Sequence, residues 1–202
     1  MKLENFAETK RPMKPSILEG EVRTSKDTNI DLPLTWNSGD VDIEDAKMYA
    51  DFNRKENLTP LTDEYKEKLK AETGWSDEII DAIGSQEEAE IYKNSGLIEA
   101  EVNGQKCLIR TDIDMDQKDE FGRTNKERMQ EGKAPLDKDG KPIELHHIGQ
   151  KSDAPLAELK REEHRGKGND AILHDKNKNS EIDREVFATQ RTEHWKSRSD
   201  NA

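Results

Sequence analysis

The sequence predicts an α+β fold in which a helical module with a β-hairpin precedes a small strand–loop–strand–helix unit and its flanking helices. Three observations predict it: three short capped segments lie within residues 58–96, an Asn-Gly pair joins two apolar stretches after them, and two more apolar stretches follow residue 140. Only 30% of the 202 residues are hydrophobic and 39% are charged. This composition disfavours a single large core and favours small modules with polar flanks.

Residues 1–57 are expected to be a linker or a partly ordered N-terminal segment, because prolines and polar residues recur there without sustained periodicity. Leu32, Leu34 and Trp36 alternate along the chain and suit one strand. Residues 45–52 suit a short helix.

Residues 58–132 are expected to form a helical module with a β-hairpin and an acidic loop. Thr62 and Ser76 suit the N-caps of two helices that end near residues 72 and 83. Ser85 and Glu88 match the capping box of a third helix.

The hairpin is predicted over residues 97–109, because Asn103-Gly104 supplies the positive φ angles that its turn requires. The acidic residues from 112 to 120 lack the glycine and the final glutamate of an EF-hand loop, so we interpret them as a solvated loop. Thr124 suits the N-cap of a brief helix that ends near residue 129.

Residues 133–202 contain the strand–loop–strand–helix unit. A short strand over 141–145 carries His146 and His147 at its far end, a second strand fits 155–159, and a helix is expected over 160–165. Successive strand residues point to opposite faces, so the two histidines should have different roles, one binding metal and the other meeting substrate. A histidine on the following helix, His164, is expected to face His146.

Four of the five histidines lie within residues 146–174. Histidine is a common nitrogen ligand of divalent metals and a common general base near neutral pH, so the cluster indicates metal-dependent chemistry. A structural zinc site is the alternative, since a segment this small and polar buries little apolar surface and needs a metal ion to stabilise its fold. Three histidine ligands leave a fourth position open, which favours a catalytic site. Asp170 or Asp175 remains an alternative ligand to His174, and Gln150 is interpreted as a loop-ordering residue.

The run Leu145-His146-His147, with Gln150, residues 155–159, His164, His174 and the residues from Arg184 to Arg198 behind it, resembles the LHH family of the HNH/endonuclease VII superfamily. These are toxin nucleases built on a ββα-metal, or treble-clef, finger, and the resemblance covers residues 133–198. It implies that His146 ligates the metal, that His147 is the general base, and that His164 and His174 complete the metal site. No asparagine lies between His147 and His164, so what orients the base is open.

A final helix is expected over residues 181–198. Arg184, Arg191 and Arg198 recur every seven residues on it, with Lys196 nearby. The stripe is either a solvated face or, beside a metal site, a nucleic-acid-binding surface that clamps phosphates.

The net charge of −12 belongs to the first part of the chain, because residues from 133 onward carry 14 Lys and Arg and 14 Asp and Glu. Because residues 133–202 carry no net charge, a local patch of basic residues must bind the phosphates of a nucleic acid. A single cysteine, Cys107, excludes an intramolecular disulfide. No apolar run is long enough to span a membrane, and the first twenty residues lack a signal-peptide core.

These features predict a metal-dependent, sequence-nonspecific endonuclease with DNA as the first candidate substrate and RNA as the second, and with one divalent ion (Zn2+, Mg2+, Mn2+ or Ni2+). The resemblance implies the toxic C-terminal effector module of a bacterial polymorphic or contact-dependent toxin system, which acts in the target-cell cytoplasm and is neutralised by a cognate immunity protein. The arginine stripe favours an acidic immunity protein, because carboxylates bind guanidinium groups well. The alternative is a non-catalytic, metal-stapled module that binds nucleic acid or protein. A free phage or homing enzyme of the HNH type fits less well, because residues 1–132 are too acidic for a DNA-recognition domain.

Overall fold

The computed structural model of the chain describes residues 22–24, 31–33, 58–166, 168–175 and 181–200. It divides into two compact units, Met1–Ala50 and Asp51–Ala202. In the first unit, strand β1 (Val22–Thr24) pairs antiparallel with strand β2 (Asp31–Pro33). The strand expected around Leu32 coincides with β2 only in part, and the helix expected over 45–52 lies outside the described residues.

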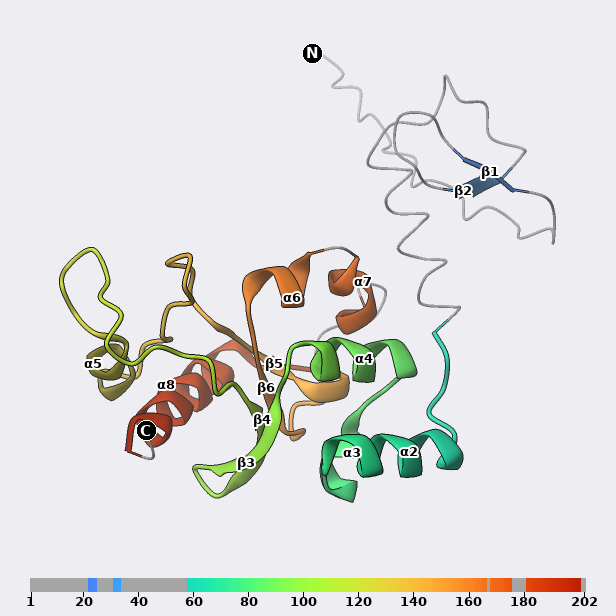
Figure 1. Cartoon of the computed structure of the whole chain (residues 1–202), viewed down its shortest axis with the longest axis horizontal. Helices are drawn as coiled ribbons and strands as arrows, with labels where there is room; N and C mark the ends of the chain where they lie inside the picture. Colours follow the sequence, from blue (N-terminus) through green and yellow to red (C-terminus); the bar gives the residue numbers. More distant parts are fainter. Residues whose placement is uncertain (1–21, 25–30, 34–57, 167, 176–180, 201–202) are drawn as a thin grey trace, which may run out of the picture. The chain divides into compact units, whose positions relative to one another are not determined.

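The second unit alternates helical and extended segments (Figure 1). Its described elements are α2 (Asp63–Thr73), α3 (Asp77–Ala82), α4 (Gln86–Asn94), β3 (Ile98–Val102), β4 (Gln105–Ile109), α5 (Asn125–Gln130), β5 (Glu144–His147), the 3-10 turn η1 (Ile148–Gln150), β6 (Leu156–Leu159), α6 (Arg161–Arg165), α7 (Asn169–Leu173) and α8 (Arg184–Asp200). Within the described residues, no helix is both long and apolar enough to cross a membrane.

The expected N-caps of α2 and α4 are present, but the second half of the Ser85–Glu88 capping box is not. Thr62 Oγ1 accepts a hydrogen bond from the Tyr65 amide, and Ser85 Oγ accepts one from the Glu88 amide. The carboxylate of Glu88 does not return to its cap. It accepts hydrogen bonds from the Gly84 amide, the Tyr92 hydroxyl and the Gly149 amide instead.

The hairpin and the finger strands form one four-stranded sheet in the order β3-β4-β6-β5. The hairpin turn has the predicted positive φ angles, 52° at Asn103 and 73° at Gly104. Strands β3 and β4 are antiparallel, as are β5 and β6, whereas β4 pairs in parallel with β6. Hydrogen bonds between β4 and β6 therefore join a strand of residues 58–132 to a strand of residues 133–202 in one sheet.

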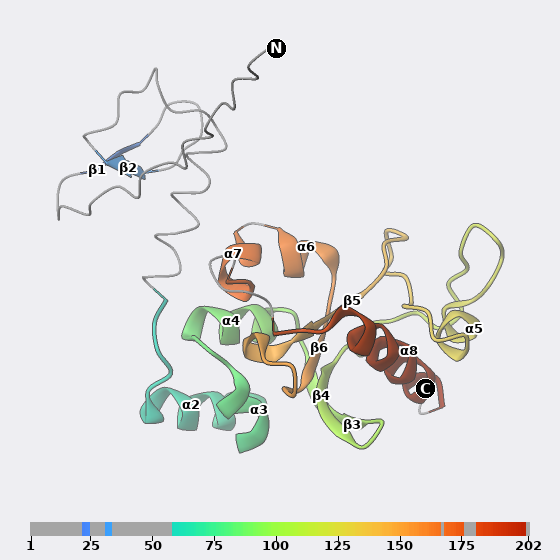
Figure 2. The ribbon, with the colours of Figure 1, turned by 180° about the vertical axis from the view of Figure 1, so that it is seen from behind.

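Helices cover both faces of this sheet, as Figures 1 and 2 show: α2, α3 and α4 lie on one side, and α5 and α8 lie on the other. The first core cluster combines Trp75, Ile80 and Tyr92 of the helical side with Ala157 and Leu159 of β6. The second combines side chains of the hairpin and the finger with those of α5 and α8, among them Cys107, Met129, Leu145, Leu156 and Trp195. Alternate residues of β6 face the two clusters, as the period of a strand requires.

The helical module braces the turn that follows the two histidines. The amide of Gly149 donates to Glu88 Oε1 at 2.8 Å, and Gly149 has a φ of 65°. A Cβ at this position would lie 2.3 Å from the carbonyl oxygen of Ala82, so only glycine allows this approach. Residues far upstream of the finger thus help to position the turn that follows His146 and His147.

Candidate metal and catalytic site

His146 and His147 are consecutive residues of β5, and both are buried on opposite faces of the sheet. His146 lies on the face covered by α4, and its ring centroid is 6.4 Å from that of Tyr92. His147 lies on the face covered by α8, with its ring centroid 4.5 Å from that of Phe187. The structure separates the two side chains as the strand period predicts.

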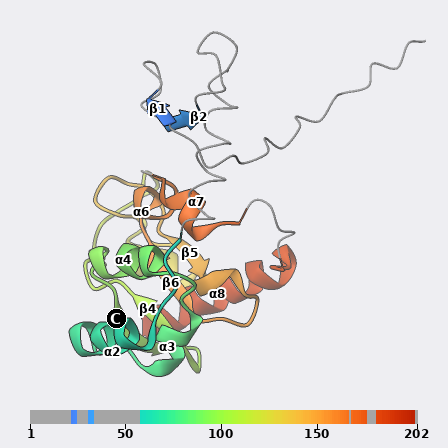
Figure 3. The ribbon, with the colours of Figure 1, turned by 90° about the vertical axis from the view of Figure 1, so that its right-hand side faces the viewer.

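Short helices carry the next two histidines to the His146 side. Helix α6 follows β6, and its residue His164 is buried. His174 lies at the C-terminal end of α7. The two helices lie side by side at one end of the sheet in Figures 1 and 3. The Nδ1 atom of His164 lies 2.6 Å from Glu144 Oε2, and the Nδ1 atom of His174 lies 2.9 Å from Asp170 Oδ1. A carboxylate on Nδ1 fixes the proton there and leaves the Nε2 lone pair free to bind a metal.

Three ring nitrogens converge between these elements. His164 Nε2 lies 3.2 Å from His146 Nδ1 and 3.1 Å from His174 Nε2, and the three candidate ligand atoms all lie within 4.8 Å of one another. Nitrogens on a tetrahedral zinc ion, at the usual bond length of about 2.0–2.1 Å, lie about 3.3 Å apart. When both Nδ1 atoms carry the proton, the Nε2 lone pairs of His164 and His174 lie 3.1 Å apart, and they repel each other unless a cation lies between them. The residues therefore fit a divalent metal ion.

The electrostatics also suit metal binding. Burial lowers the pKa of His164, and this effect outweighs the hydrogen bond to Glu144, so the imidazole is neutral near pH 7. Burial alone would raise the pKa of Glu144, but its interactions with Arg165 and His164 hold the pKa below its ordinary value. A neutral imidazole backed by an ionised carboxylate is the form in which histidine binds a metal.

His147 has a different environment. Its Nε2 atom lies 3.2 Å from the side-chain oxygen of Gln190, and the Phe187 ring packs against the imidazole. Burial lowers the pKa of His147 below 6.5, although the contact with Gln190 acts in the opposite direction. The imidazole is therefore neutral near pH 7 and able to accept a proton.

Comparison with known families agrees with this geometry. Residues 124–201 match the family model described as a nuclease of the HNH/ENDO VII superfamily with conserved LHH, and Leu145-His146-His147 supplies that tripeptide. The chain carries a nuclease domain of the LHH family. No solved structure matches the chain significantly.

In this LHH domain, β5, β6 and α6 form the ββα finger, and the matched region also includes α5 and α8. Gln150 orders the segment that carries His174: its oxygen accepts from the Asp175 amide at 2.8 Å, and its nitrogen donates to the carbonyl of Leu173. Among the described residues, His146, His164 and His174 are the group able to hold a metal. Asp170 contacts His174 from behind the cluster, where it orients the ring.

The basic stripe on α8 of the LHH domain is only partly at the surface. Arg184, Arg191 and Lys196 are exposed, and the Arg191 guanidinium lies 4.9 Å from the centroid of the Phe187 ring. The expectation for Arg198 is wrong. Its side chain is buried, donates to Glu158 Oε1 at 2.8 Å and to the carbonyl of Arg110, and so does not face a phosphate. The three arginines lie on one face of α8. This face is exposed to solvent at Arg184 and Arg191, and it is buried against the sheet at Arg198, nearer the C-terminal end of the helix.

Sequence reasoning missed two groups in this LHH domain. Glu158 is fully buried in β6 and binds His194 and Arg198 of α8, which fixes the helix against the sheet. Its signal was an acidic residue inside the apolar run of residues 156–159. No local sequence pattern predicted that Gln190 contacts His147, because the two residues are 43 positions apart.

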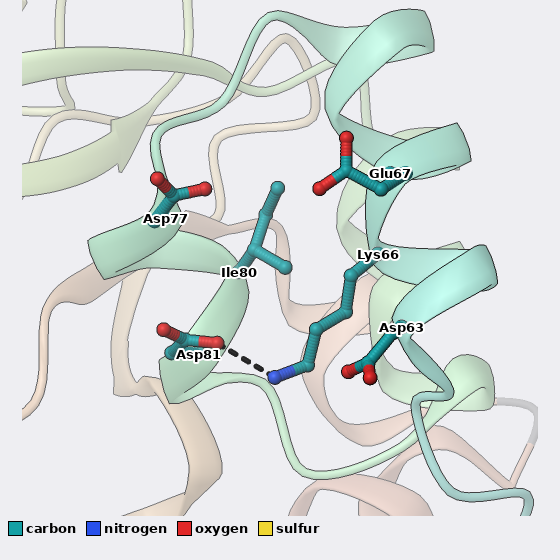
Figure 4. Close-up of a pocket in the computed structure, with 6 residues that line it drawn as sticks. All are labelled: Asp63, Lys66, Glu67, Asp77, Ile80 and Asp81. Carbon is teal, nitrogen blue, oxygen red and sulfur yellow. Dashed lines mark hydrogen bonds and ion pairs between the residues drawn. The ribbon is translucent and has the colours of Figure 1, made fainter.

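A pocket between α2 and α3 lies apart from the histidines (Figure 4). Lys66 spans it to reach Asp81 at 2.6 Å, and the other charged lining residues, Asp63, Glu67 and Asp77, are acidic. An acidic lining repels phosphate, so this pocket is unsuited to nucleic acid.

Proposed function

We propose that this protein is a metal-dependent, sequence-nonspecific endonuclease that hydrolyses phosphodiester bonds in DNA in preference to RNA. The observation that carries the proposal is the pairing of two sites on one strand. A three-imidazole cluster built on His146 lies on one face of β5, and a separate neutral imidazole, His147, lies on the other.

Each group has a role in phosphodiester hydrolysis. His146, His164 and His174 would hold one divalent ion: Zn2+, Mg2+, Mn2+ or Ni2+. Such an ion, when bound, supplies positive charge to the scissile phosphate and to the departing 3′-oxygen. His147 takes a proton from the attacking water as general base.

Arg184, Arg191 and Lys196 provide the positive charge for substrate binding, since all three are exposed on α8. The Phe187 ring contacts both His147 and Arg191. Guanidinium groups bind phosphate oxygens without regard to the base, which supports cleavage without sequence specificity.

The test uses the purified full chain with supercoiled plasmid, and with RNA in parallel, in each of the four metal ions and in chelator. We expect nicked and then linear plasmid with metal and none with chelator. His147→Ala, purified identically, controls for contaminating nucleases, and Gln130→Ala is the matched variant at an exposed position of α5. Retained metal without cleavage of either substrate would contradict the proposal and favour the non-catalytic, metal-stapled binding module.

We also propose that the nuclease acts as the toxic effector module of a bacterial polymorphic or contact-dependent toxin system, in the cytoplasm of the target cell. The resemblance to LHH toxin nucleases supports this role. Such a toxin requires a cognate immunity protein, and the exposed cations of α8 favour an acidic one that covers Arg184 and Arg191. Expression of the chain in a bacterium, compared with His147→Ala, tests toxicity: unimpaired growth with active enzyme would contradict the role.

A further inference from the structure

The orientation of the candidate base is the open question of this LHH domain. Residues 148–163 contain no asparagine, so the middle residue of the HNH pattern has no counterpart in the loop. Two side chains of α8 contact the His147 ring instead. Phe187 packs against it, and the Gln190 oxygen lies 3.2 Å from its Nε2 atom.

We propose that Gln190 is the positioning residue for His147, with its amide oxygen accepting a hydrogen bond from Nε2–H so that Nδ1 carries the lone pair that accepts the proton of water. This inference rests on the proposed function, because it concerns the orientation of that base.

The amide oxygen decides the tautomer. A neutral imidazole carries one N–H, and a carbonyl oxygen can only accept a hydrogen bond, so the nitrogen facing it carries the proton. Among the described residues, no group hydrogen-bonds the Nδ1 atom of His147. Nδ1 is thus the nitrogen that carries the lone pair and can accept a proton.

A rigid element holds the acceptor in place. Gln190 lies one turn after Phe187 on α8, and one turn before His194, which binds the buried carboxylate of Glu158 at 2.9 Å. Arg198 binds the same carboxylate one turn later. The helix is therefore anchored to β6 at two successive turns, and β6 pairs with the strand that carries His147. Contact with Gln190 and Phe187 from one helix leaves the ring little freedom to turn.

The first test measures the tautomer directly in the full chain. Long-range 1H–15N spectra of 15N-histidine-labelled protein at pH 7.5, with the resonance assigned by its loss in His147→Gln, identify the protonated ring nitrogen. We expect protonation at Nε2. Protonation at Nδ1 in the wild-type protein overturns the proposal without any reference to activity.

The second test compares two substitutions. Gln190→Leu removes the acceptor while keeping a similar side-chain length, and kcat for plasmid cleavage should fall about 10- to 100-fold, with KM and bound metal unchanged. Gln190→Glu keeps an acceptor and should keep the Nε2–H tautomer and most of kcat. The matched control is Gln130→Leu, the same change at an exposed position of α5.

The outcomes separate this inference from the proposed function. Wild-type kcat in Gln190→Leu overturns the positioning role while the nuclease assignment stands. An equal loss in Gln190→Leu and Gln190→Glu, with melting temperatures unchanged, overturns it as well. Absence of cleavage by the wild-type chain with every metal ion refutes the nuclease proposal itself, and the positioning role with it.

Discussion

The guanidinium of Arg198 donates to the carboxylate of Glu158 at 2.8 Å inside the protein, where Glu158 is fully buried. This pair connects the last helix, α8, to β6, which is one of the two inner strands of the sheet. His194 binds the same carboxylate oxygen at 2.9 Å. The contact makes Arg198 part of the fold, whereas Arg184 and Arg191 of the same stripe remain exposed.

Arg198→Ala should destabilise the protein by about 3–5 kcal/mol, because it removes the arginine from a buried carboxylate that otherwise keeps only His194 and the amide of Arg110 as hydrogen-bonding partners. Urea denaturation followed by circular dichroism measures the change. Arg191→Ala is the control, and it should alter the free energy of unfolding little because its side chain is exposed. Equal stability of the two variants would show that the Glu158 network does not hold α8.

The stabilising effect of Glu158 should depend on pH. Burial raises its pKa, but hydrogen bonds from His194 and Arg198 outweigh burial and hold the pKa below the ordinary value of 4.5. A lowered pKa in the folded state means that this stability is fully present above the unfolded pKa, and is lost as pH falls through the folded pKa. The unfolding free energies of wild type and Glu158→Gln, measured in chelator, should therefore differ most near pH 6 and converge below pH 4.5. A difference that is constant with pH would contradict this linkage.

His146→Ala and His164→Ala should lose bound metal and the stability that metal confers. Ligand binding to the folded state alone adds about 2.7 kcal/mol when the free ion is 100-fold above its Kd. Differential scanning with and without chelator measures this: wild type should melt lower in chelator, whereas the variants should not respond. A melting temperature that still responds to chelator in either variant would remove that histidine from the ligand set.

His147→Ala should abolish cleavage while leaving metal content near that of wild type, because its side chain lies on the sheet face opposite the histidine cluster. Removal of a general base typically lowers the rate by about 100- to 10,000-fold. Plasmid cleavage and elemental analysis of the same preparation decide the matter. Loss of metal together with activity would mean that the two histidines share or exchange their roles.

Arg184→Glu with Arg191→Glu should weaken binding to DNA and to an acidic immunity protein without unfolding the chain. Two fewer phosphate contacts should lower the slope of log affinity against log salt by about 2. Titrations at several salt concentrations, on protein whose melting temperature is unchanged, measure both affinities. If DNA binding weakens and inhibitor binding stays, the immunity protein binds another surface, such as the acidic helical module.

Local patterns determined much of this protein. The strand period separated His146 from His147 because side-chain alternation is a property of the backbone itself. The caps at Thr62 and Thr124 and the turn at Asn103-Gly104 were predictable for the same reason, since each depends on residues within three positions. The order strand, strand, helix and the resemblance to LHH nucleases together placed His164 opposite His146.

Only the tertiary structure decided how these pieces combine. The parallel pairing of β4 with β6, which merges the hairpin with the finger, depends on residues almost fifty positions apart. The same holds for the contact between Gln190 and His147, and for the burial of Arg198 against Glu158. A seven-residue spacing places three arginines on one helix face, but it does not show which part of that face is exposed and which part is buried. Burial is set by what packs against a helix, and that information lies elsewhere in the chain.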